Sequence, residues 1–144
     1  MQSTSQQEIS QRLKSHFPHV PTEGQERLIE AFSRFLFSDK PKCTLLVKGY
    51  AGTGKTTSIG AIVRTLIEIG KTFVMLAPTG RAAKVMASYS GINANTIHRF
   101  IYKAQTDANG ERGYTIAKNR FKNSVFIVDE ASMIGADSGL LDDL

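Results

Sequence analysis

The sequence predicts an α/β fold in which helices flank a parallel sheet. Apolar runs expected to form strands alternate along the chain with segments whose apolar residues recur at helical spacing. These runs are almost wholly apolar, which is typical of parallel strands covered on both faces rather than of strands with one face in water. At 144 residues the chain is about one domain long.

Two helices are expected first. Residues 1–7 are rich in Gln, Ser and Thr and should fray, and a short helix should cover 8–16. Thr22 stands three residues before Gln25, which is the spacing of a capping box, and apolar residues then recur at helical spacing. These features predict a second helix over 23–37.

A buried strand is expected over 43–48, where Cys43 begins an apolar run. Cys43 is the single cysteine, so it predicts a buried thiol in a reducing compartment and leaves no partner for a disulfide or a cysteine zinc site. A third helix should then end at a C-cap formed by Gly70. Its apolar residues are Ile59, Ile62, Val63, Leu66 and Ile67.

The second half of the chain predicts two more strands, over 72–77 and 125–128. After the first of them the chain should turn at 78–80 and form a helix over 81–89.

Between these strands a short helix is expected, capped by Asn95 or Thr96 and running through Phe100. Residues 104–115 are polar and contain several turn-forming residues, so they predict a loop or a small hairpin. We find no internal repeat and no linker that would divide the chain into domains.

The segment GYAGTGKT matches the pattern G-x-x-x-x-G-K-[ST] of a phosphate-binding loop. Gly49, Gly52 and Gly54 allow the backbone to curl around a phosphate with its N–H groups pointing inward. Lys55 places a cation on the β and γ phosphates, and the Thr56 hydroxyl can bind Mg²⁺. The alternative is an ordinary glycine-rich turn between a strand and a helix. We predict that the chain binds a nucleoside triphosphate.

The expected strand over 125–128 ends in Asp129 and Glu130, at the edge of the sheet where ligands bind in open α/β folds. Asp129 can hold Mg²⁺, and Glu130 can orient and deprotonate the water that attacks the γ phosphate. The alternative is a solvated strand end, because acid pairs are common. Together with the phosphate loop, the two carboxylates favour ATP hydrolysis over a kinase reaction, whose acceptor needs a site of its own.

The net charge of +5 and the pI of about 9.5 favour an anionic partner. The first residues lack the apolar stretch of a signal peptide, and no apolar run approaches the roughly 18 residues that a membrane helix needs. We expect a soluble protein of a bacterial-type cytoplasm, associated with the nucleoid, or of the nucleus or mitochondrion if the source is eukaryotic.

Four sequence blocks occur in a fixed order: Gly49–Thr57, Ala77–Lys84, Thr96–Phe100 and Val128–Met133. Together they resemble motifs I, Ia, Ib and II in the first RecA-like domain of superfamily 1B DNA helicases of the RecD/PIF/Dda branch. The resemblance covers about residues 22–140. It implies a RecA-like P-loop NTPase domain over 21–144, incomplete at its C-terminus, after a polar and helical lead-in over 1–20.

The resemblance also implies roles for individual residues. For ATP binding it points to Gln25, Gly49, Ala51, Gly52, Thr53, Gly54, Lys55, Thr56 and Thr57. For Mg²⁺ it points to Thr56 and Asp129, and for catalysis to Lys55 and Glu130. For contact with single-stranded DNA it points to Pro78, Thr79, Gly80, Arg81, Thr96, His98 and Arg99.

Three of these assignments have plain alternatives. The block Pro78–Arg81 resembles a loop that touches the DNA backbone, and the alternative is an ordinary Pro-Thr-Gly turn. Gln25 resembles a glutamine that reads the adenine edge, and the alternative is a surface residue in the first turn of a helix. His98 resembles a DNA-contacting residue, and the alternative is a packed or capping histidine of a short helix.

The resemblance implies ATP hydrolysis coupled to 5′-to-3′ translocation on single-stranded DNA, in DNA repair, recombination or telomere maintenance. It also implies parts outside these residues: motif III, a strand between the phosphate-loop and motif II strands, and a second RecA-like domain with an arginine finger. Such a finger contributes roughly 10³ to 10⁵ in rate, so these residues alone should be nearly inactive. The alternatives are a small-molecule P-loop kinase and a catalytically idle fragment that binds nucleotide or DNA.

Overall fold

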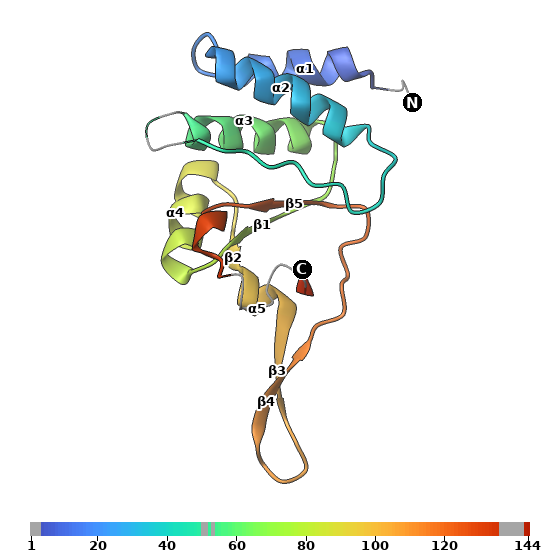
Figure 1. The fold of residues 1–144 in the computed structure, drawn as a ribbon, viewed down its shortest axis with the longest axis vertical. Helices are drawn as coiled ribbons and strands as arrows, with labels where there is room; N and C mark the ends of the chain where they lie inside the picture. The colour runs from blue at the N-terminus through green and yellow to red at the C-terminus, as the bar shows by residue number, and fades with distance from the viewer. Residues whose placement is uncertain (1–3, 50–51, 53, 136–142) are drawn as a thin grey trace. The chain divides into compact units, whose positions relative to one another are not determined.

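The computed structural model describes residues 4–49, 52, 54–135 and 143–144 (Figure 1). The chain forms two compact units, Met1–Gly70 and Lys71–Leu144, which we call the N-terminal unit and the C-terminal unit. Within the described residues, no helix is both long and apolar enough to cross a membrane.

The N-terminal unit contains three helices, α1 (Gln6–Ser15), α2 (Glu23–Leu36) and α3 (Lys55–Glu68). The capping box predicted for α2 is confirmed, because the Gln25 N–H donates to Thr22 Oγ1 at 3.3 Å and the Thr22 N–H donates to Gln25 Oε1 at 3.0 Å. Helix α1 starts earlier than predicted.

The prediction that residues 1–7 fray is wrong for its last part, because Ser5 and Glu8 form a second capping box. The Glu8 N–H donates to Ser5 Oγ at 3.2 Å, and α1 therefore begins at Gln6. The left-handed conformation of Gly70, with φ of +66°, follows α3 and fits the predicted C-cap.

The core of the N-terminal unit forms where α1 packs against α2 and α3. Its buried apolar residues recur at helical spacing, as the sequence predicted: Ile9, Leu13, Phe17, Ile29, Phe32, Ala61, Ile62, Val63 and Leu66. A partly buried hydroxyl pair lies between α1 and α2, where Ser10 Oγ and Ser33 Oγ are 2.8 Å apart. Ser33 Oγ also donates to the Ile29 carbonyl at 2.8 Å, so the pair is satisfied inside the core.

The predicted buried strand over 43–48 is wrong. These residues are assigned to no strand, Leu46 is 69% exposed and Val47 is 46% exposed. The predicted burial of Cys43 is also wrong, because this thiol is exposed. An extended apolar segment becomes a strand only when its backbone groups pair with a neighbouring strand, and the described part of the N-terminal unit contains no strand.

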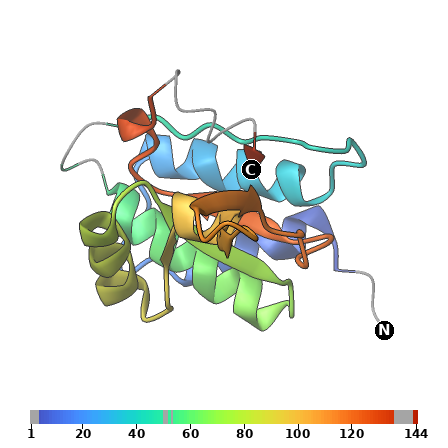
Figure 2. The same cartoon turned by 90° about the horizontal axis from the view of Figure 1, so that it is seen from below.

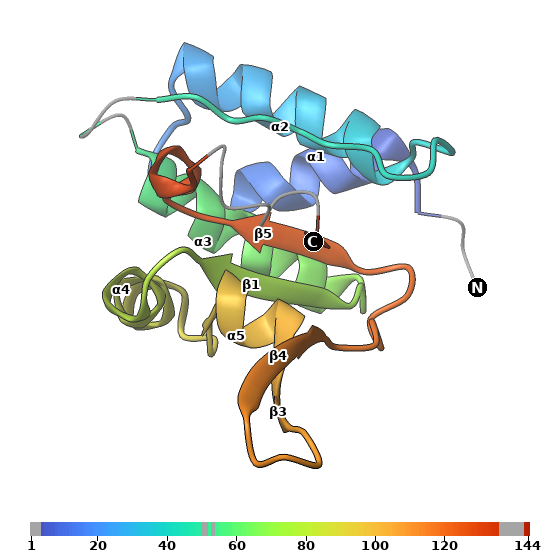
Figure 3. The same cartoon turned by 60° about the horizontal axis from the view of Figure 1, so that its bottom comes forward.

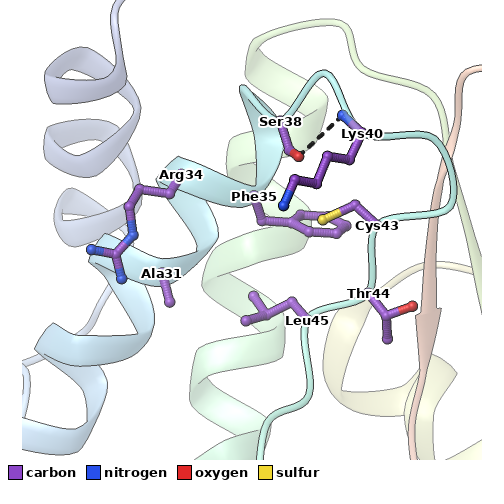
Figure 4. Close-up of a pocket in the computed structure, with 8 residues that line it drawn as sticks. All are labelled: Ala31, Arg34, Phe35, Ser38, Lys40, Cys43, Thr44 and Leu45. Atoms are coloured by element: carbon purple, nitrogen blue, oxygen red, sulfur yellow. Dashed lines mark hydrogen bonds between the residues drawn. The ribbon is translucent and has the colours of Figure 1, made fainter.

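The segment that follows α2 folds back along this helix instead. Figure 4 shows Cys43 and Leu45 on the side of this segment that faces α2, whereas Thr44 points to the other side; these residues and Phe35 line a pocket of about 330 Å³. Within the run 43–48, Leu45 alone is half-buried, and the other residues are exposed.

The C-terminal unit contains a three-stranded parallel sheet in the order β2-β1-β5. Its elements are β1 (Phe73–Ala77), α4 (Gly80–Ser90), β2 (Asn95–Thr96), α5 (Ile97–Ile101), β3 (Tyr102–Thr106), β4 (Arg112–Ile116), β5 (Val125–Val128) and the 3₁₀ turn η1 (Ala131–Met133). The predicted strands over 72–77 and 125–128, the helix over 81–89 and the small hairpin are confirmed. Among the described strands, β2 and β5 form the edges of the sheet.

Strand register places the carboxyl ends of the three strands side by side. Ala77 of β1 lies opposite Thr96, and Leu76 lies opposite Val128. The Asp129 N–H continues this pairing with a hydrogen bond to the Leu76 carbonyl at 3.1 Å.

A second core lies under this sheet, where α5 packs against β1 (Figure 3). Its buried members are Val74, Leu76, Ile97 and Ile101. The antiparallel hairpin of β3 and β4 extends away from the sheet and is seen end-on in Figure 2. Every residue of β4 is exposed, so cross-strand pairing and the turn hold the hairpin, rather than a covered face.

We expect Leu66→Ala to lower the free energy of unfolding by about 2–5 kcal/mol, because it opens a cavity in the N-terminal core. Leu66 is 0% exposed, whereas its neighbour Ile67 on the same helix is 53% exposed. Ile67→Ala is therefore the matched control and should cost much less. Urea unfolding of both variants measures the difference, and equal losses would contradict the packing described here.

Candidate functional site

The phosphate-loop residues of the N-terminal unit combine unusual backbone conformations with a free helix start. Gly52 and Gly54 have φ of +81° and +80°, the left-handed region that glycine tolerates best. Gly54 is the N-cap of α3, and within the described residues no side chain caps this helix and no acid occupies its first turn. The N–H groups and the positive end of α3 thus remain available for an anion.

The structure describes some of the residues of this loop that are predicted to bind ATP. Lys55 and Thr56 are exposed in the first turn of α3, and Thr57 is half-buried behind them. Ala51 and Thr53, also predicted to bind ATP, lie outside the described residues.

Gln25 supports the loop from α2. Its side-chain Nε2 donates to the Gly54 carbonyl at 3.3 Å, while its Oε1 completes the capping box with Thr22. The same carbonyl accepts the Ser58 N–H at 3.0 Å and Ser58 Oγ at 2.9 Å. Gln25 is 4% exposed, so the alternative of a surface glutamine is wrong. Its contact with adenine stays a prediction.

In the C-terminal unit, Asp129 follows β5 and both of its carboxylate oxygens accept hydrogen bonds. Oδ1 accepts the Glu130 N–H at 2.8 Å, and Oδ2 accepts the Tyr89 hydroxyl at 2.6 Å. Glu130 is exposed and has a left-handed backbone, with φ of +56°, which turns the chain sharply into η1. The two acids therefore differ: Asp129 is held and half-buried, whereas Glu130 is free to meet a solvent molecule.

Tyr89 is a residue of this site that the sequence analysis missed. Burial raises the pKa of its hydroxyl, and the hydrogen bond to the Asp129 carboxylate and the nearby acidic charges raise it further. Tyr89 precedes Asp129 by forty residues, and no motif or periodicity connects them. Only the pairing of β1 with β5 brings α4 beside Asp129.

The two predicted DNA-contacting blocks start at the same sheet edge as Asp129. Thr79 caps α4 by accepting the Ala82 N–H at 3.1 Å, and Thr96 caps α5 by accepting the Arg99 N–H at 3.1 Å. Of the two caps predicted for the short helix, Thr96 is the one observed. Neither helix has an acid in its first turn. The structure thus brings two helix starts and one acidic strand end together.

The remaining residues of these blocks lie around the helix starts. Pro78 is half-buried, and Gly80 and Arg81 are exposed in the first turn of α4. His98 and Arg99 are exposed on α5.

His98 lies in an aromatic cluster that the sequence analysis did not foresee. Its ring is 4.7 Å from the Tyr102 ring and 5.6 Å from the Tyr114 ring, measured between centroids. Tyr114 belongs to the hairpin and is 69% exposed. His98 is therefore packed against two tyrosine rings, as the alternative of a packed histidine predicts. It is nevertheless exposed and does not belong to a core.

A pocket of about 580 Å³ lies beside the hairpin in the C-terminal unit. It collects cationic and aromatic side chains, including Arg99, Lys103, Lys118, Arg120, Phe100 and Phe121. Lys118 and Arg120, which follow the hairpin in sequence, thus line the same pocket as Arg99 of α5.

The residues present fit Mg²⁺ shared with a nucleotide. Mg²⁺ takes oxygen ligands and is usually bound by one or two carboxylates together with substrate phosphates. No group of three or more His, Cys, Asp or Glu side chains gathers in the described part of the chain, as an all-protein cage would require. The half-buried Asp129 carboxylate can supply the one carboxylate that Mg²⁺ shared with a nucleotide needs. Lys55 and Thr56 lie in the N-terminal unit, so their union with Asp129 in one site stays a prediction.

Residues 22–140 match the family model described as the AAA domain. The chain belongs to this family. The match includes the phosphate loop, the two blocks predicted to contact DNA and the Asp129–Glu130 pair.

Three relatives illustrate the range of proteins to which this AAA domain chain is similar. It is 33% identical to the multifunctional conjugation protein TraI of Escherichia coli over 124 residues, which cover 81% of this chain and 7% of TraI. It is 38% identical to the ATP-dependent DNA helicase dda of Enterobacteria phage T4 over 81 residues, which cover 56% of this chain and 18% of that helicase. It is 29% identical to the ATP-dependent RecD2 DNA helicase of Deinococcus radiodurans over 119 residues, which cover 81% of this chain and 16% of that helicase.

The chain thus spans less than a fifth of the length of each of these relatives. They confirm the resemblance to superfamily-one helicases of the RecD/Dda type. The α/β fold class of a P-loop NTPase domain, with a parallel sheet flanked by helices, is confirmed as well.

We expect Gly54→Ala to destabilise the protein by more than about 1 kcal/mol, because a left-handed alanine is strained. An added Cβ would also lie 2.5 Å from Gln25 Nε2. Gly24→Ala is the matched control, since the nearest atom to its added Cβ is 4.0 Å away and α2 should gain helix propensity there. Thermal unfolding should show a lower Tm for Gly54→Ala and an unchanged or higher Tm for Gly24→Ala. A Gly54→Ala variant as stable as wild type would contradict this view of the loop.

Proposed function

We propose that the chain is part of the ATP-driven motor of a DNA helicase. The observation that carries the proposal is the meeting of Asp129 with the two Thr-capped, acid-free helix starts of α4 and α5 at one sheet edge. The same chain contains a phosphate loop, and its relatives include proteins named ATP-dependent DNA helicases.

The proposed ATP site takes its residues from the phosphate loop, from Gln25 and from the Asp129–Glu130 pair, as the sequence predicts. The phosphate loop and the Lys55 ammonium would hold the β and γ phosphates, and Gln25 would contact the adenine. Thr56 and Asp129 hold Mg²⁺, which when bound neutralises charge on the phosphate oxygens. Glu130 orients the attacking water and takes its proton, a role that suits its exposed carboxylate.

Single-stranded DNA is the proposed partner of the α4 and α5 starts. Backbone N–H groups at helix N-termini and hydroxyls such as those of Thr79 and Thr96 suit phosphate contacts. Arg81 and Arg99 are exposed in the first turns of these helices and add positive charge. The exposed ring of His98 adds a surface on which a base can stack.

We further propose that residues 21–144 belong to one RecA-like domain, preceded by a lead-in over 1–20. A second RecA-like domain would supply the arginine finger and close on this one when ATP binds, and translocation would run 5′ to 3′. A bacterial-type cytoplasm is the proposed location. The kinase alternative loses support, because the relatives named here are helicases and a conjugation protein.

The first test is ATP hydrolysis by the protein as it is encoded, measured with and without oligo-dT. We expect oligo-dT to raise kcat, and Glu130→Gln to lower it by about 10² to 10⁴, as removal of a general base does. Lys55→Ala should abolish hydrolysis. Glu30→Gln and Lys40→Ala are the matched controls, since both residues are exposed elsewhere. Hydrolysis that is indifferent to oligo-dT would overturn the helicase proposal.

A second test follows the salt dependence of oligo-dT binding by fluorescence anisotropy. Each lost phosphate contact to single-stranded nucleic acid should reduce the slope of log K against log salt by about 0.7. We expect this reduction for Arg81→Ala and for Arg99→Ala. Arg27→Ala is the control, because Arg27 is an exposed arginine of α2 whose pairing with Glu23 is long, at 3.9 Å. An unchanged slope in both variants would remove these residues from the DNA surface.

A further inference from the structure

The hydrogen bond between Tyr89 and Asp129 is a contact at the candidate site that the proposed chemistry leaves unexplained. The Tyr89 hydroxyl donates to Asp129 Oδ2 at 2.6 Å, from the last turn of α4 to the end of β5. Figure 3 views α4 along its axis, with the helix lying across the carboxyl end of β1 rather than alongside the strand. This crossing brings the end of the helix, and not only its start, to the sheet edge.

The geometry leaves the carboxylate able to bind a cation while it accepts both bonds. Its two oxygens together offer about four lone-pair sites, of which the Glu130 N–H and the Tyr89 hydroxyl occupy one on each oxygen. A phenol is protonated at neutral pH, so Tyr89 acts as the donor and adds no negative charge. The remaining lone pairs are free for a metal ion or for water bound to it.

We infer that Tyr89 is a positioning residue for Mg²⁺ binding by Asp129. The inference rests on the proposed function, because it takes Asp129 as the Mg²⁺ ligand. The backbone bond from Glu130 holds one oxygen, and the Tyr89 hydroxyl fixes the other, so rotation of the carboxylate about its Cβ–Cγ bond is suppressed. That torsion is otherwise broad, and ordering it on metal binding costs free energy.

The magnitude follows from what donors behind metal ligands contribute in general. Removing such a partner typically weakens metal affinity by about 10-fold to 100-fold. Tyr89→Phe removes only the hydroxyl and keeps the half-buried ring, so the packing of α4 should persist.

The chain offers a matched control. Tyr102 also donates its hydroxyl to an aspartate, Asp143, in the same unit. Tyr102→Phe therefore deletes the same group from the same kind of pair. Any general effect of losing a tyrosine–aspartate bond should appear in both variants.

The experiment is a binding measurement on the protein as it is encoded, with a ribose-labelled fluorescent ATP analogue titrated with MgCl₂. For Tyr89→Phe we expect the half-saturating Mg²⁺ concentration to rise by about 10-fold or more. Affinity for the analogue in EDTA should not change, which also shows that the variant is folded. Tyr102→Phe should match wild type in both measurements. An unchanged or lower Mg²⁺ requirement in Tyr89→Phe overturns the inference.

A double-mutant cycle with Asp129→Asn isolates the contact. If Tyr89 acts through Asp129, its loss should have little further effect in the Asp129→Asn background. Full additivity of the two substitutions overturns the inference even if Tyr89→Phe alone weakens Mg²⁺ binding. Failure of the proposed function gives a different result: wild type itself then binds no analogue, or binds it without regard to Mg²⁺.

Discussion

Parallel pairing of β1 with β2 on one side and β5 on the other is the constraint on which the C-terminal unit depends. Parallel strands present all their carboxyl ends at one edge, so the residues that follow each strand must meet there. Register makes the meeting specific, because Ala77 lies opposite Thr96 while Leu76 lies opposite Val128. Segments distant in sequence become neighbours, and polar groups gather where the backbone leaves the sheet.

The helices divide into two groups by how their N-termini are satisfied. Helices α1 and α2 are closed by capping boxes and have glutamates in the first turn, which complement the positive end of the helix internally. Helices α3, α4 and α5 have no acid there. This difference suits the first group to building the fold and the second group to meeting anions. The presence or absence of an acid in the first turn follows from local sequence. Whether a helix start can meet an anion also depends on where the strands place it.

Gln25 shows how one side chain can connect these two groups. It closes the cap of α2 and at the same time bonds the Gly54 carbonyl at the start of α3. A Cβ on Gly54 would lie 2.5 Å from Gln25 Nε2 and would make this side chain shift, while the left-handed backbone of Gly54 itself favours glycine. Support of the loop by a buried amide is a tertiary fact that the motif pattern alone does not contain.

The sequence by itself determined the helices, because capping boxes and apolar spacing act within a few residues, and it determined the phosphate loop, the Asp129–Glu130 pair and the family. Strands β1 and β5 were also predictable, since their apolar runs are long and find partners. The segment 43–48 has an equally apolar run but lies in a unit whose described residues provide no strand to pair with it, so neither strand nor burial follows. Tyr89 and Tyr114 joined the candidate site only through the fold. Their partners are distant in sequence, and a contact of that kind depends on strand register and helix direction, which tertiary packing alone decides.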